Sequence, residues 1–357
     1  MNIRRMIIPV VLLIMIAIVG GCGSSASGNE GEPEYKFKMS NVSEESNVVS
    51  AGLEKFAELA NSKSDGRIQI DVIHGAQLGT GVETFEAVRN GNLDFAADSF
   101  ANLNSVTPAF EIFHLPFLFE SKEQAWNAVL DENVMGLVNE ELGEQGVRFF
   151  SVLDMGGPRQ ISTTDFKIEK INDLTGKSIR ASRSPMEVAM HEAWGAAGQT
   201  VDWPEVPESL RLGMVDGVTV SYPYIRSASL HEGNLVKYIA DVNAQWFSYV
   251  TVVNQDMWDG LPEDIQEILT EAAREAEEWH HEYVGEKVEE DIQILTEAGV
   301  EIYTLPEETY EELKEMTIDK VWDQFIGDPG ISQEKLDLIQ EAKGPVGDKG
   351  WGYTIPE

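Results

Sequence analysis

Cysteine and basic residues are both scarce in this sequence. Cys22 is the single cysteine among 357 residues, so no disulfide can form within one chain. The 26 Lys and Arg residues stand against 62 Asp and Glu residues, which gives a formal net charge of -36. Phosphate binding needs a surplus of Lys and Arg, so we expect no nucleic-acid partner. An anionic bilayer surface would also repel a folded body of this charge.

Known catalytic and metal-binding motifs are missing as well. The chain contains no G-x-S-x-G, P-loop, H-E-x-x-H or C-x-x-C pattern. Its six histidines form no metal-binding spacing, because the adjacent His280 and His281 would point apart on a helix. The sequence therefore predicts no enzyme, no catalytic residue, no cofactor and no metal site.

The longest apolar run lies close to the N-terminus. A short basic segment precedes Met6–Val19, and two glycines then lead to Cys22. The run is too short to span a bilayer comfortably. We expect a secretory signal peptide over 1–21 that ends in a lipobox, with Cys22 as the lipidated residue and a polar tether over 22–34. This layout predicts an extracytoplasmic, lipid-anchored protein; a signal peptide with an incidental cysteine is the alternative.

The first folded region reads as an α/β unit. Strand-like alternation over 35–39, 67–72 and 93–97 is separated by two stretches of helical spacing, which predicts a βαβαβ unit with parallel strands. A helix over 122–143 and a strand over 147–152 follow. The glycines and proline of Met155–Pro158 then suit a hinge.

Arg180 ends the next predicted strand, at 177–181, just before a helix expected from Pro185 to Gly198. Open α/β sheets bind small ligands at the carboxyl ends of their strands, and a guanidinium fork matches a carboxylate. Trp203 follows a strand expected at 199–202. Arg180 and Trp203 should therefore face the same crevice.

The last part of the chain is predicted to connect two lobes. A strand over 246–253 returns to the first lobe, and helical spacing begins near Leu261 and continues to Gly299. Such a helix is roughly 55 Å long, more than the width of one lobe, with Gly285 as a candidate kink.

Several short motifs, taken in their order and spacing, resemble the extracytoplasmic solute-binding proteins of TRAP transporters, the DctP-type family. They are Leu115–Phe119, Gly157–Gln160, Asp173–Arg180, Glu205-Val206 with Leu210, Gly213–Gly217 and Leu261–Asp264. The resemblance covers nearly the whole mature chain. It implies a two-lobe α/β fold like that of periplasmic binding proteins, with hinge crossovers and one long helix spanning both lobes. Lobe I would comprise 35–155 and 247–285, and lobe II 156–246 and 286–357.

By this resemblance the protein captures a small organic acid between its lobes and delivers it to the TRAP membrane permease subunits. Arg180 matches the arginine that forms a two-pronged salt bridge with the substrate carboxylate, and Arg159 matches a second, supporting arginine. Trp203 falls at an aromatic wall of the pocket, and Asp98 at a first-lobe position that faces the ligand. Three alternatives stay open: Arg159 as the structural partner of an acid, Trp203 as a core residue, and Asp98 as a helix cap or strand-end residue.

The sequence departs from the family where many members carry Glu-Asn that reaches the ligand. Thr219-Val220 stand there instead, and Val220 cannot donate a hydrogen bond. Aromatic residues gather near the predicted crevice loops: Phe100, Trp203, Tyr222, Tyr224, Trp246 and Phe247. The expected substrate-binding residues are Arg180, Arg159, Trp203, Asp98, Phe100, Val220, Tyr222 and Trp246. These residues predict a monocarboxylate with an apolar body. A dicarboxylate or sugar acid, service to an ATP-driven importer or sensor, and a secreted α/β enzyme are the alternatives.

Overall fold

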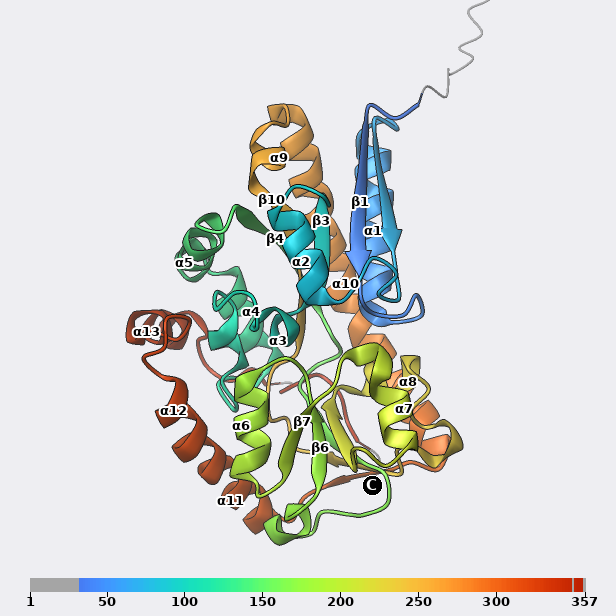
Figure 1. Ribbon diagram of the computed structural model, residues 1–357, viewed down its shortest axis with the longest axis vertical. Coiled ribbons are helices and arrows are strands. Elements are labelled where there is room, and N and C mark those ends of the chain that lie inside the picture. Colours follow the sequence, from blue (N-terminus) through green and yellow to red (C-terminus); the bar gives the residue numbers. More distant parts are fainter. Residues whose placement is uncertain (1–31, 349, 356–357) are drawn as a thin grey trace, which may run out of the picture. The chain divides into compact units, whose positions relative to one another are not determined.

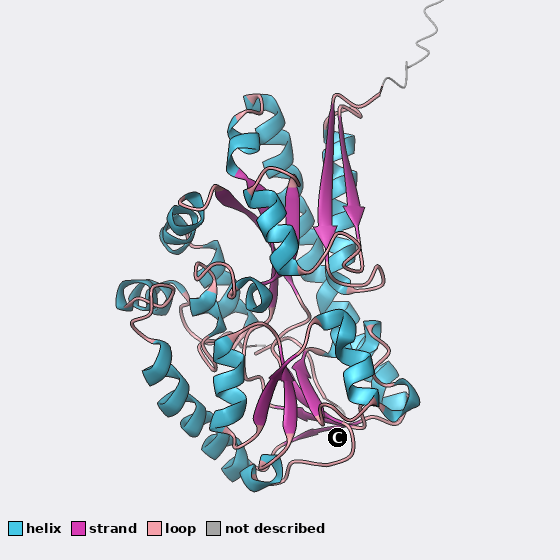
Figure 2. Ribbon diagram, viewed as in Figure 1, coloured by secondary structure: helices cyan, strands magenta, loops and turns pink. Residues whose placement is uncertain are grey.

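Two β-sheets organise the part of the chain that the computed structural model describes, residues 32–348 and 350–355 (Figure 2). The described residues from Pro33 onward pack into a single unit. The predicted signal peptide over 1–21 and the predicted lipidation site Cys22 lie outside the described residues. Within those residues, no helix has the length and apolarity needed to cross a bilayer.

The first sheet has the strand order β2-β1-β3-β10-β4 (Figure 1). Its strands are β1 (Tyr35–Asn41), β2 (Ile68–Ile73), β3 (Phe95–Ser99), β4 (Val147–Asp154) and β10 (Ser248–Asn254). Strand β1 pairs in parallel with β2 and β3, which confirms the predicted βαβαβ unit. Strand β10 lies antiparallel between β3 and β4, so the chain returns to this sheet late, as predicted.

The helices of this region connect and cover the first sheet. They are α1 (Val48–Lys63), α2 (Gly81–Arg89), α3 (Phe100–Leu103), the 3₁₀ turn η1 (Glu111–His114), α4 (Lys122–Leu130), α5 (Glu132–Gly143) and α9 (Gln255–Asp259). The single helix predicted over 122–143 is wrong. It breaks at Asp131, whose carboxylate accepts hydrogen bonds from the backbone nitrogens of Asn133 and Val134 and so caps a new helix.

The second sheet has the order β11-β9-β5-β8-β6-β7. Its strands are β5 (Gln160–Thr163), β6 (Ser178–Ala181), β7 (Ala197–Thr200), β8 (Gly217–Val220), β9 (Tyr238–Asp241) and β11 (Glu301–Thr304). Strand β6 is parallel to both β7 and β8, so their carboxyl ends share one edge. The helix before β7 ends at Ala193 instead of Gly198, because Gly195 turns the chain with a φ of +83°.

Shorter helices connect the strands of the second sheet, and a helical segment ends the chain. They are η2 (Ile171–Leu174), α6 (Pro185–Ala193), η3 (Trp203–Glu205), α7 (Val206–Arg211), α8 (Tyr222–Ser227), η4 (Glu232–Asn234), α11 (Glu307–Thr317), η5 (Ile318–Trp322), α12 (Asp323–Phe325) and α13 (Gln333–Ala342). Helices α11 and α13 come from the C-terminal part of the chain, yet α11 packs on α6 while α13 packs on α4 and α5.

Helix α10 (Glu263–Glu297) has 35 residues and continues through Gly285. Its apolar face packs on α1 and on strand β4 of the first sheet, and it also packs on α8 next to the second sheet. Glu277 accepts a hydrogen bond of 2.8 Å from the backbone nitrogen of Val152. The predicted long helix that spans both parts is therefore present, while the lobe boundaries stay a prediction.

Candidate binding site

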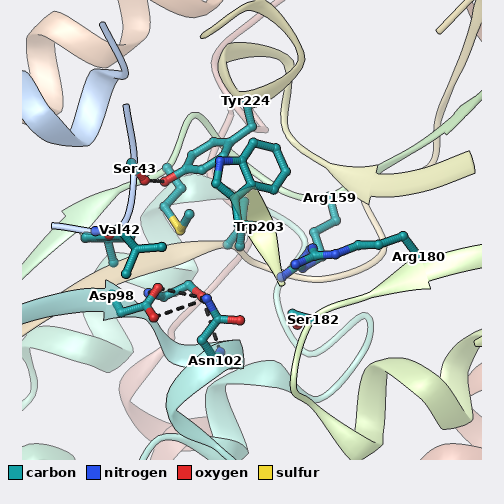
Figure 3. A pocket seen from close by; sticks show the side chains of 13 residues that line it. Val42, Ser43, Asp98, Asn102, Arg159, Arg180, Ser182, Trp203 and Tyr224 are labelled. Atoms are coloured by element: carbon teal, nitrogen blue, oxygen red, sulfur yellow. Dashed lines mark hydrogen bonds between the residues drawn. The ribbon is translucent and has the colours of Figure 1, made fainter. Parts of the chain in front are cut away.

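A small cavity lies where the two sheets face each other (Figure 3). The residues that line it are Val42, Ser43, Asp98, Ser99, Asn102, Met155, Arg159, Arg180, Ser182, Trp203, Tyr224, Phe247 and Tyr249. The space open to the centre of a water molecule is about 20 Å³, room for one or two waters. A larger solute can therefore enter only if the two walls move apart.

Arg180 projects into the cavity from the end of β6 and is 2% exposed. Its Nε donates to the carbonyl oxygen of Val201 at 2.9 Å, and its guanidinium carbon lies 5.7 Å from the centre of the Trp203 ring. Among the described residues, neither Nη atom of Arg180 has a hydrogen-bond partner. Burial, opposed by Glu187, lowers the pKa of Arg180 to about 10. The fork thus stays cationic at neutral pH and is free to bind two oxygens.

Arg159 lies beside Arg180 in the same wall and is completely buried (Figure 3). Its Nη1 lies 3.3 Å from a carboxylate oxygen of Glu187 and also donates to the carbonyl oxygen of Thr219. Its guanidinium carbon lies 3.9 Å from the centre of the Phe247 ring. Its Nε and Nη2 find no partner in the part of the chain that the structure describes. Arg159 therefore both pairs with an acid and lines the cavity.

Glu187 comes from the first turn of α6 and is also completely buried. Its Oε2 accepts hydrogen bonds from the backbone nitrogen of Ser182, at 3.0 Å, and from the Ser182 hydroxyl. Its Oε1 accepts one from Thr219 Oγ1 at 2.7 Å. Burial acts to raise the pKa of Glu187, but Arg159 and Arg180 outweigh burial and bring it to about 2. This wall therefore holds two positive charges and one negative charge.

Asp98, at the end of β3, faces the arginines from the opposite wall (Figure 3). Its carboxylate accepts hydrogen bonds from the backbone nitrogen of Ser99 at 2.6 Å and from Asn102 Nδ2 at 2.9 Å. The side chain is 3% exposed, and burial raises its pKa to about 7. A Cβ added to Gly81 would lie 1.5 Å from Asp98 Oδ2, so only glycine fits beside this carboxyl group.

The segment between β1 and α1, residues 42–47, contacts residues next to the second sheet beside the cavity. The Trp203 indole nitrogen donates to Glu44 at 3.1 Å, and the hydroxyls of Ser43 and Tyr224 lie 2.9 Å apart. Further along, Asn47 donates to Ser227 Oγ at 2.8 Å. Three side-chain hydrogen bonds therefore hold the two walls together around the cavity.

The sequence over residues 39–328 matches the model of bacterial extracellular solute-binding protein, family 7 (DctP). The chain belongs to this family. The C4-dicarboxylate-binding protein DctB of Bacillus subtilis is 25% identical over 320 residues, which cover 87% of each chain. A solute-binding protein of Chromohalobacter salexigens is 26% identical over 291 residues, 82% of this chain and 84% of that one.

The fold is also that of a solved TRAP periplasmic solute-binding protein from Desulfovibrio salexigens, crystallised with bound orotic acid. The TM-score is 0.80 at 20% identity, and the alignment covers 87% of this chain and 98% of the other. This agreement confirms the fold expected from the resemblance, including the long helix. Within the described residues of the family 7 chain, no group of three or more His, Cys, Asp or Glu side chains could hold a metal ion.

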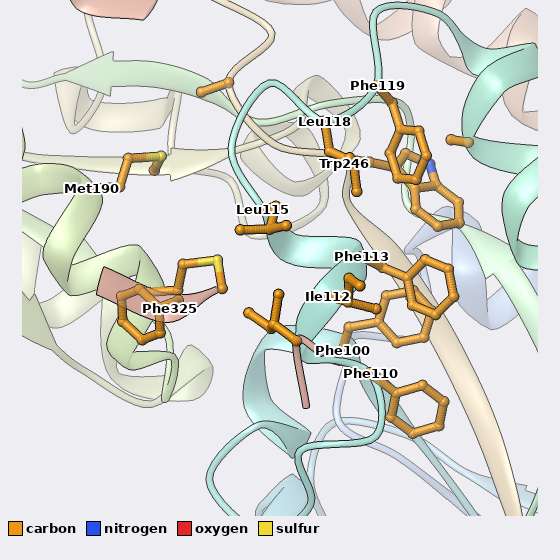
Figure 4. Close-up of a cluster of buried hydrophobic side chains, with 14 of the residues drawn as sticks. Phe100, Phe110, Ile112, Phe113, Leu115, Leu118, Phe119, Met190, Trp246 and Phe325 are labelled. Atoms are coloured by element: carbon orange, nitrogen blue, oxygen red, sulfur yellow. The ribbon is translucent and has the colours of Figure 1, made fainter. Parts of the chain in front are cut away.

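Four of the eight predicted binding residues line the cavity of this family 7 protein, namely Arg180, Arg159, Trp203 and Asp98. The structure does not bring Phe100 or Trp246 to the cavity, because their rings lie 5.8 Å apart inside an aromatic cluster (Figure 4). Val220 is buried on the β8 face opposite to Thr219, since alternate strand residues point to opposite sides. Tyr222 turns its hydroxyl to Asp241 at 2.7 Å.

Sequence reasoning missed several residues of the site. Ser182 lies between the predicted strand at 177–181 and the helix expected from Pro185, where the sequence predicts no ligand contact. Asn102 carries a signal only in its four-residue spacing from Asp98. Glu187 is one of 62 acidic residues and has no local signal, because its partner Arg159 lies 28 positions away. Val42, Met155 and Tyr249 also line the cavity, and nothing in their sequence surroundings separates them from core residues.

Proposed function

We propose that this family 7 protein captures a small organic acid by pairing its carboxylate with Arg180 and delivers it to the membrane permease of a TRAP transporter. The observation that carries the proposal is the buried guanidinium of Arg180, whose two Nη atoms face the cavity without a partner among the described residues. A buried cation costs folding free energy unless it is paired, so a site that leaves one unpaired is suited to an anionic ligand.

The preferred ligand is a monocarboxylate with an apolar body. Beyond the arginines, apolar and aromatic side chains supply much of the cavity surface: Val42, Met155, Trp203, Tyr224, Phe247 and Tyr249. The relatives named above include a C4-dicarboxylate-binding protein and one crystallised with orotic acid, which has one carboxyl group. A dicarboxylate or a sugar acid is therefore the principal alternative.

Capture would proceed by closure of two lobes, lobe I over 35–155 and 247–285 and lobe II over 156–246 and 286–357. Two features support this division. Strand β4 ends at Asp154 and β10 begins at Ser248, so the chain changes sheets near the boundaries at 155/156 and 246/247, while the third boundary, at 285/286, lies within helix α10. The cavity is also too small for an organic acid unless its walls separate.

The proposed cellular setting follows from the N-terminal sequence. A signal peptide over 1–21 and lipidation at Cys22 would leave the protein outside the cytoplasm, tethered to a membrane near its permease. Mass spectrometry of protein extracted from cell membranes tests the anchor, because a diacylglycerol-modified Cys22 at the new N-terminus changes the mass of the first peptide. A first peptide that carries no lipid would contradict it.

A thermal-shift screen of organic acids tests the ligand class, because a ligand that binds only the native state raises the melting temperature. Monocarboxylates with aliphatic or aromatic bodies should raise it more than dicarboxylates or uronic acids do. A response restricted to dicarboxylates or uronic acids would favour the alternative ligand. Consumption of a bound acid, followed by chromatography, would instead support a secreted enzyme. Copurification with an ATP-driven importer would contradict the TRAP assignment.

A further inference from the structure

We propose that Glu187 sets the charge of the binding site: by neutralising Arg159 it leaves Arg180 as the single uncompensated cation and restricts the ligand to one carboxylate. The inference rests on the proposed function and adds a specificity-determining residue to it. Glu187 does not line the cavity. It acts on the ligand only through the charge and position of its neighbours.

The contacts of Glu187 leave no acceptor position free for a ligand. Oε1 is engaged by Thr219 Oγ1 at 2.7 Å and by Arg159 Nη1 at 3.3 Å. Oε2 is engaged by the backbone nitrogen and the hydroxyl of Ser182. Both Glu187 and Arg159 are 0% exposed, so water screens their interaction little. The pair is therefore a fixed part of the cavity wall.

The charges that line the cavity support a ligand with a single carboxylate. Among the described residues that line the cavity, Arg159 and Arg180 are the only cationic ones, and Glu187 compensates one of them. The described residues of the opposite wall include the carboxyl group of Asp98 and no Lys or Arg. A second carboxylate on the ligand would therefore meet either a guanidinium that already has a counter-ion or another carboxyl group. Beside Arg159 it would gain hydrogen bonds but no uncompensated positive charge, and beside Asp98 it would meet a group that repels it when ionised.

The position of Thr219 explains how an acid on α6 can serve this role. The resemblance to TRAP solute-binding proteins places a glutamate at this position in many members, whereas here a threonine hydroxyl donates to Glu187. In this chain the acidic partner of Arg159 lies on helix α6, and Thr219 of strand β8 donates to it. Aspartate is close to threonine in size, so in a Glu187→Gln protein Thr219→Asp would supply the negative charge from β8, a short distance from the original carboxylate.

The test compares acids that differ only by a second carboxylate: butyrate with succinate, and benzoate with phthalate. Calorimetry gives the ratio of diacid to monoacid affinity for wild type, Glu187→Gln, and Glu187→Gln combined with Thr219→Asp. Loss of the Glu187 charge should shift the ratio toward the diacid by tenfold or more, and Thr219→Asp should reverse most of that shift. Glu192→Gln removes the same charge from the exposed side of α6 and should leave the ratio unchanged.

A folded Glu187→Gln protein with an unchanged ratio would overturn the inference. If that variant does not fold, the neutral pair Arg159→Gln with Glu187→Gln replaces it, because the net charge of the site is then preserved. The neutral pair should keep the monoacid preference, and a tenfold shift toward the diacid would also overturn the inference. If the wild-type protein binds none of the four acids, the proposed function is contradicted. If the wild type binds the monoacids and the Glu187→Gln variant has the same diacid-to-monoacid ratio, only the role of Glu187 is contradicted.

Discussion

The indole nitrogen of Trp203 donates a hydrogen bond to the carboxylate of Glu44 across the cavity, at 3.1 Å. Trp203 belongs to η3 beside the second sheet, and Glu44 follows β1 of the first sheet. The same indole ring lies over the Arg180 guanidinium, with 5.7 Å between the guanidinium carbon and the ring centre. One side chain therefore contacts both the proposed carboxylate-binding cation and the opposite wall.

Glu44→Ala should weaken ligand binding mainly by speeding dissociation. The change removes a hydrogen bond that joins the two walls of the cavity, and a hydrogen bond to a charged group contributes about 1.5–3 kcal/mol, or roughly 10- to 150-fold in affinity if the proposed closure forms it. Stopped-flow measurement of the intrinsic fluorescence of the eight tryptophans would follow both rates. The neighbouring exposed Glu45 is the matched control, since Glu45→Ala removes an equal charge outside the contact. Equal dissociation rates in the two variants would contradict a closing role for Glu44.

Asp98 should make ligand binding depend on pH near neutrality. Its pKa is raised by burial to about 7, so the ionised form that repels a bound carboxylate dominates above that pH. Affinity for an acid should therefore fall as the pH rises from 6 to 8. The size of the fall depends on how far the bound acid raises the pKa of Asp98, and each pH unit of that increase corresponds to about a tenfold loss of affinity. Asp98→Asn should remove this dependence and bind more tightly than wild type at pH 8. A flat wild-type profile measured by calorimetry would refute the prediction.

The same carboxyl group also affects stability without ligand. The folded pKa of about 7 lies above the unfolded value of about 3.9, so the folded state holds its proton over a range where the unfolded state has lost it. The Asp98 contribution to the free energy of unfolding is therefore highest below the unfolded pKa and falls as the pH rises to about 7. Denaturant titrations of wild type and Asp98→Asn should converge at low pH and separate toward pH 8, with wild type the less stable.

Gly81→Ala should destabilise the protein through its contact with Asp98. The new Cβ would lie 1.5 Å from Asp98 Oδ2, and forcing an extra methyl group into a packed site costs about 1–3 kcal/mol. The loss should shrink in an Asp98→Ala background, where the clashing carboxylate is gone. Gly136→Ala is the matched control, because it lies within α5 with no atom near its added Cβ and should stabilise by about 0.5–1 kcal/mol. Chemical denaturation of Gly81→Ala, Asp98→Ala, the double variant and Gly136→Ala gives these free energies of unfolding. If Gly81→Ala lowered stability equally in the wild-type and the Asp98→Ala proteins, the coupling between the two positions would be refuted.

Much of the fold followed from local pattern, because periodicity in strands and helices is visible over a few residues. The βαβαβ start, the late strand β10 and the 35-residue helix α10 were all predicted in this way. The position of Arg180 followed from the rule that sites form at strand ends. Contacts between distant segments carry no such pattern. Nothing near Glu187 indicates a partner 28 residues earlier.

The aromatic residues show a second limit of sequence reasoning. Six of them were placed near the crevice loops, and three line the cavity: Trp203, Tyr224 and Phe247. Phe100 and Trp246 instead lie in the buried cluster of Figure 4, because the same large apolar ring suits a core as well as a ligand wall. Only the three-dimensional direction of each side chain separates the two uses.

Tyr353→Phe should destabilise the junction between the C-terminal segment and the chain crossing near Gly157. The Tyr353 hydroxyl accepts from Gln160 Nε2 at 2.8 Å and donates to Asn243 Oδ1 at 2.7 Å. Removing the hydroxyl deletes hydrogen bonds that contribute about 0.5–1.5 kcal/mol each, while Gln160 Nε2 and Asn243 Oδ1 stay joined at 2.8 Å. Tyr283→Phe is the control, because the Tyr283 ring stacks on Trp279 and no hydrogen bond joins its hydroxyl to a described residue. Equal free energies of unfolding in the two variants, measured in denaturant, would argue against a structural role for this hydroxyl.

Arg180 is the residue on which the proposed function depends, and calorimetry with its best monocarboxylate tests it most directly. Truncating one partner of a buried, hydrogen-bonded charge pair costs about 2–5 kcal/mol, so Arg180→Ala should lose roughly 30-fold or more in affinity. Arg180→Lys should also lose much of its affinity, because an ammonium lacks the fork that matches two oxygens. Arg183→Ala, which removes an exposed arginine paired with Asp202, should bind as wild type does. Wild-type affinity in a folded Arg180→Ala protein would contradict the account.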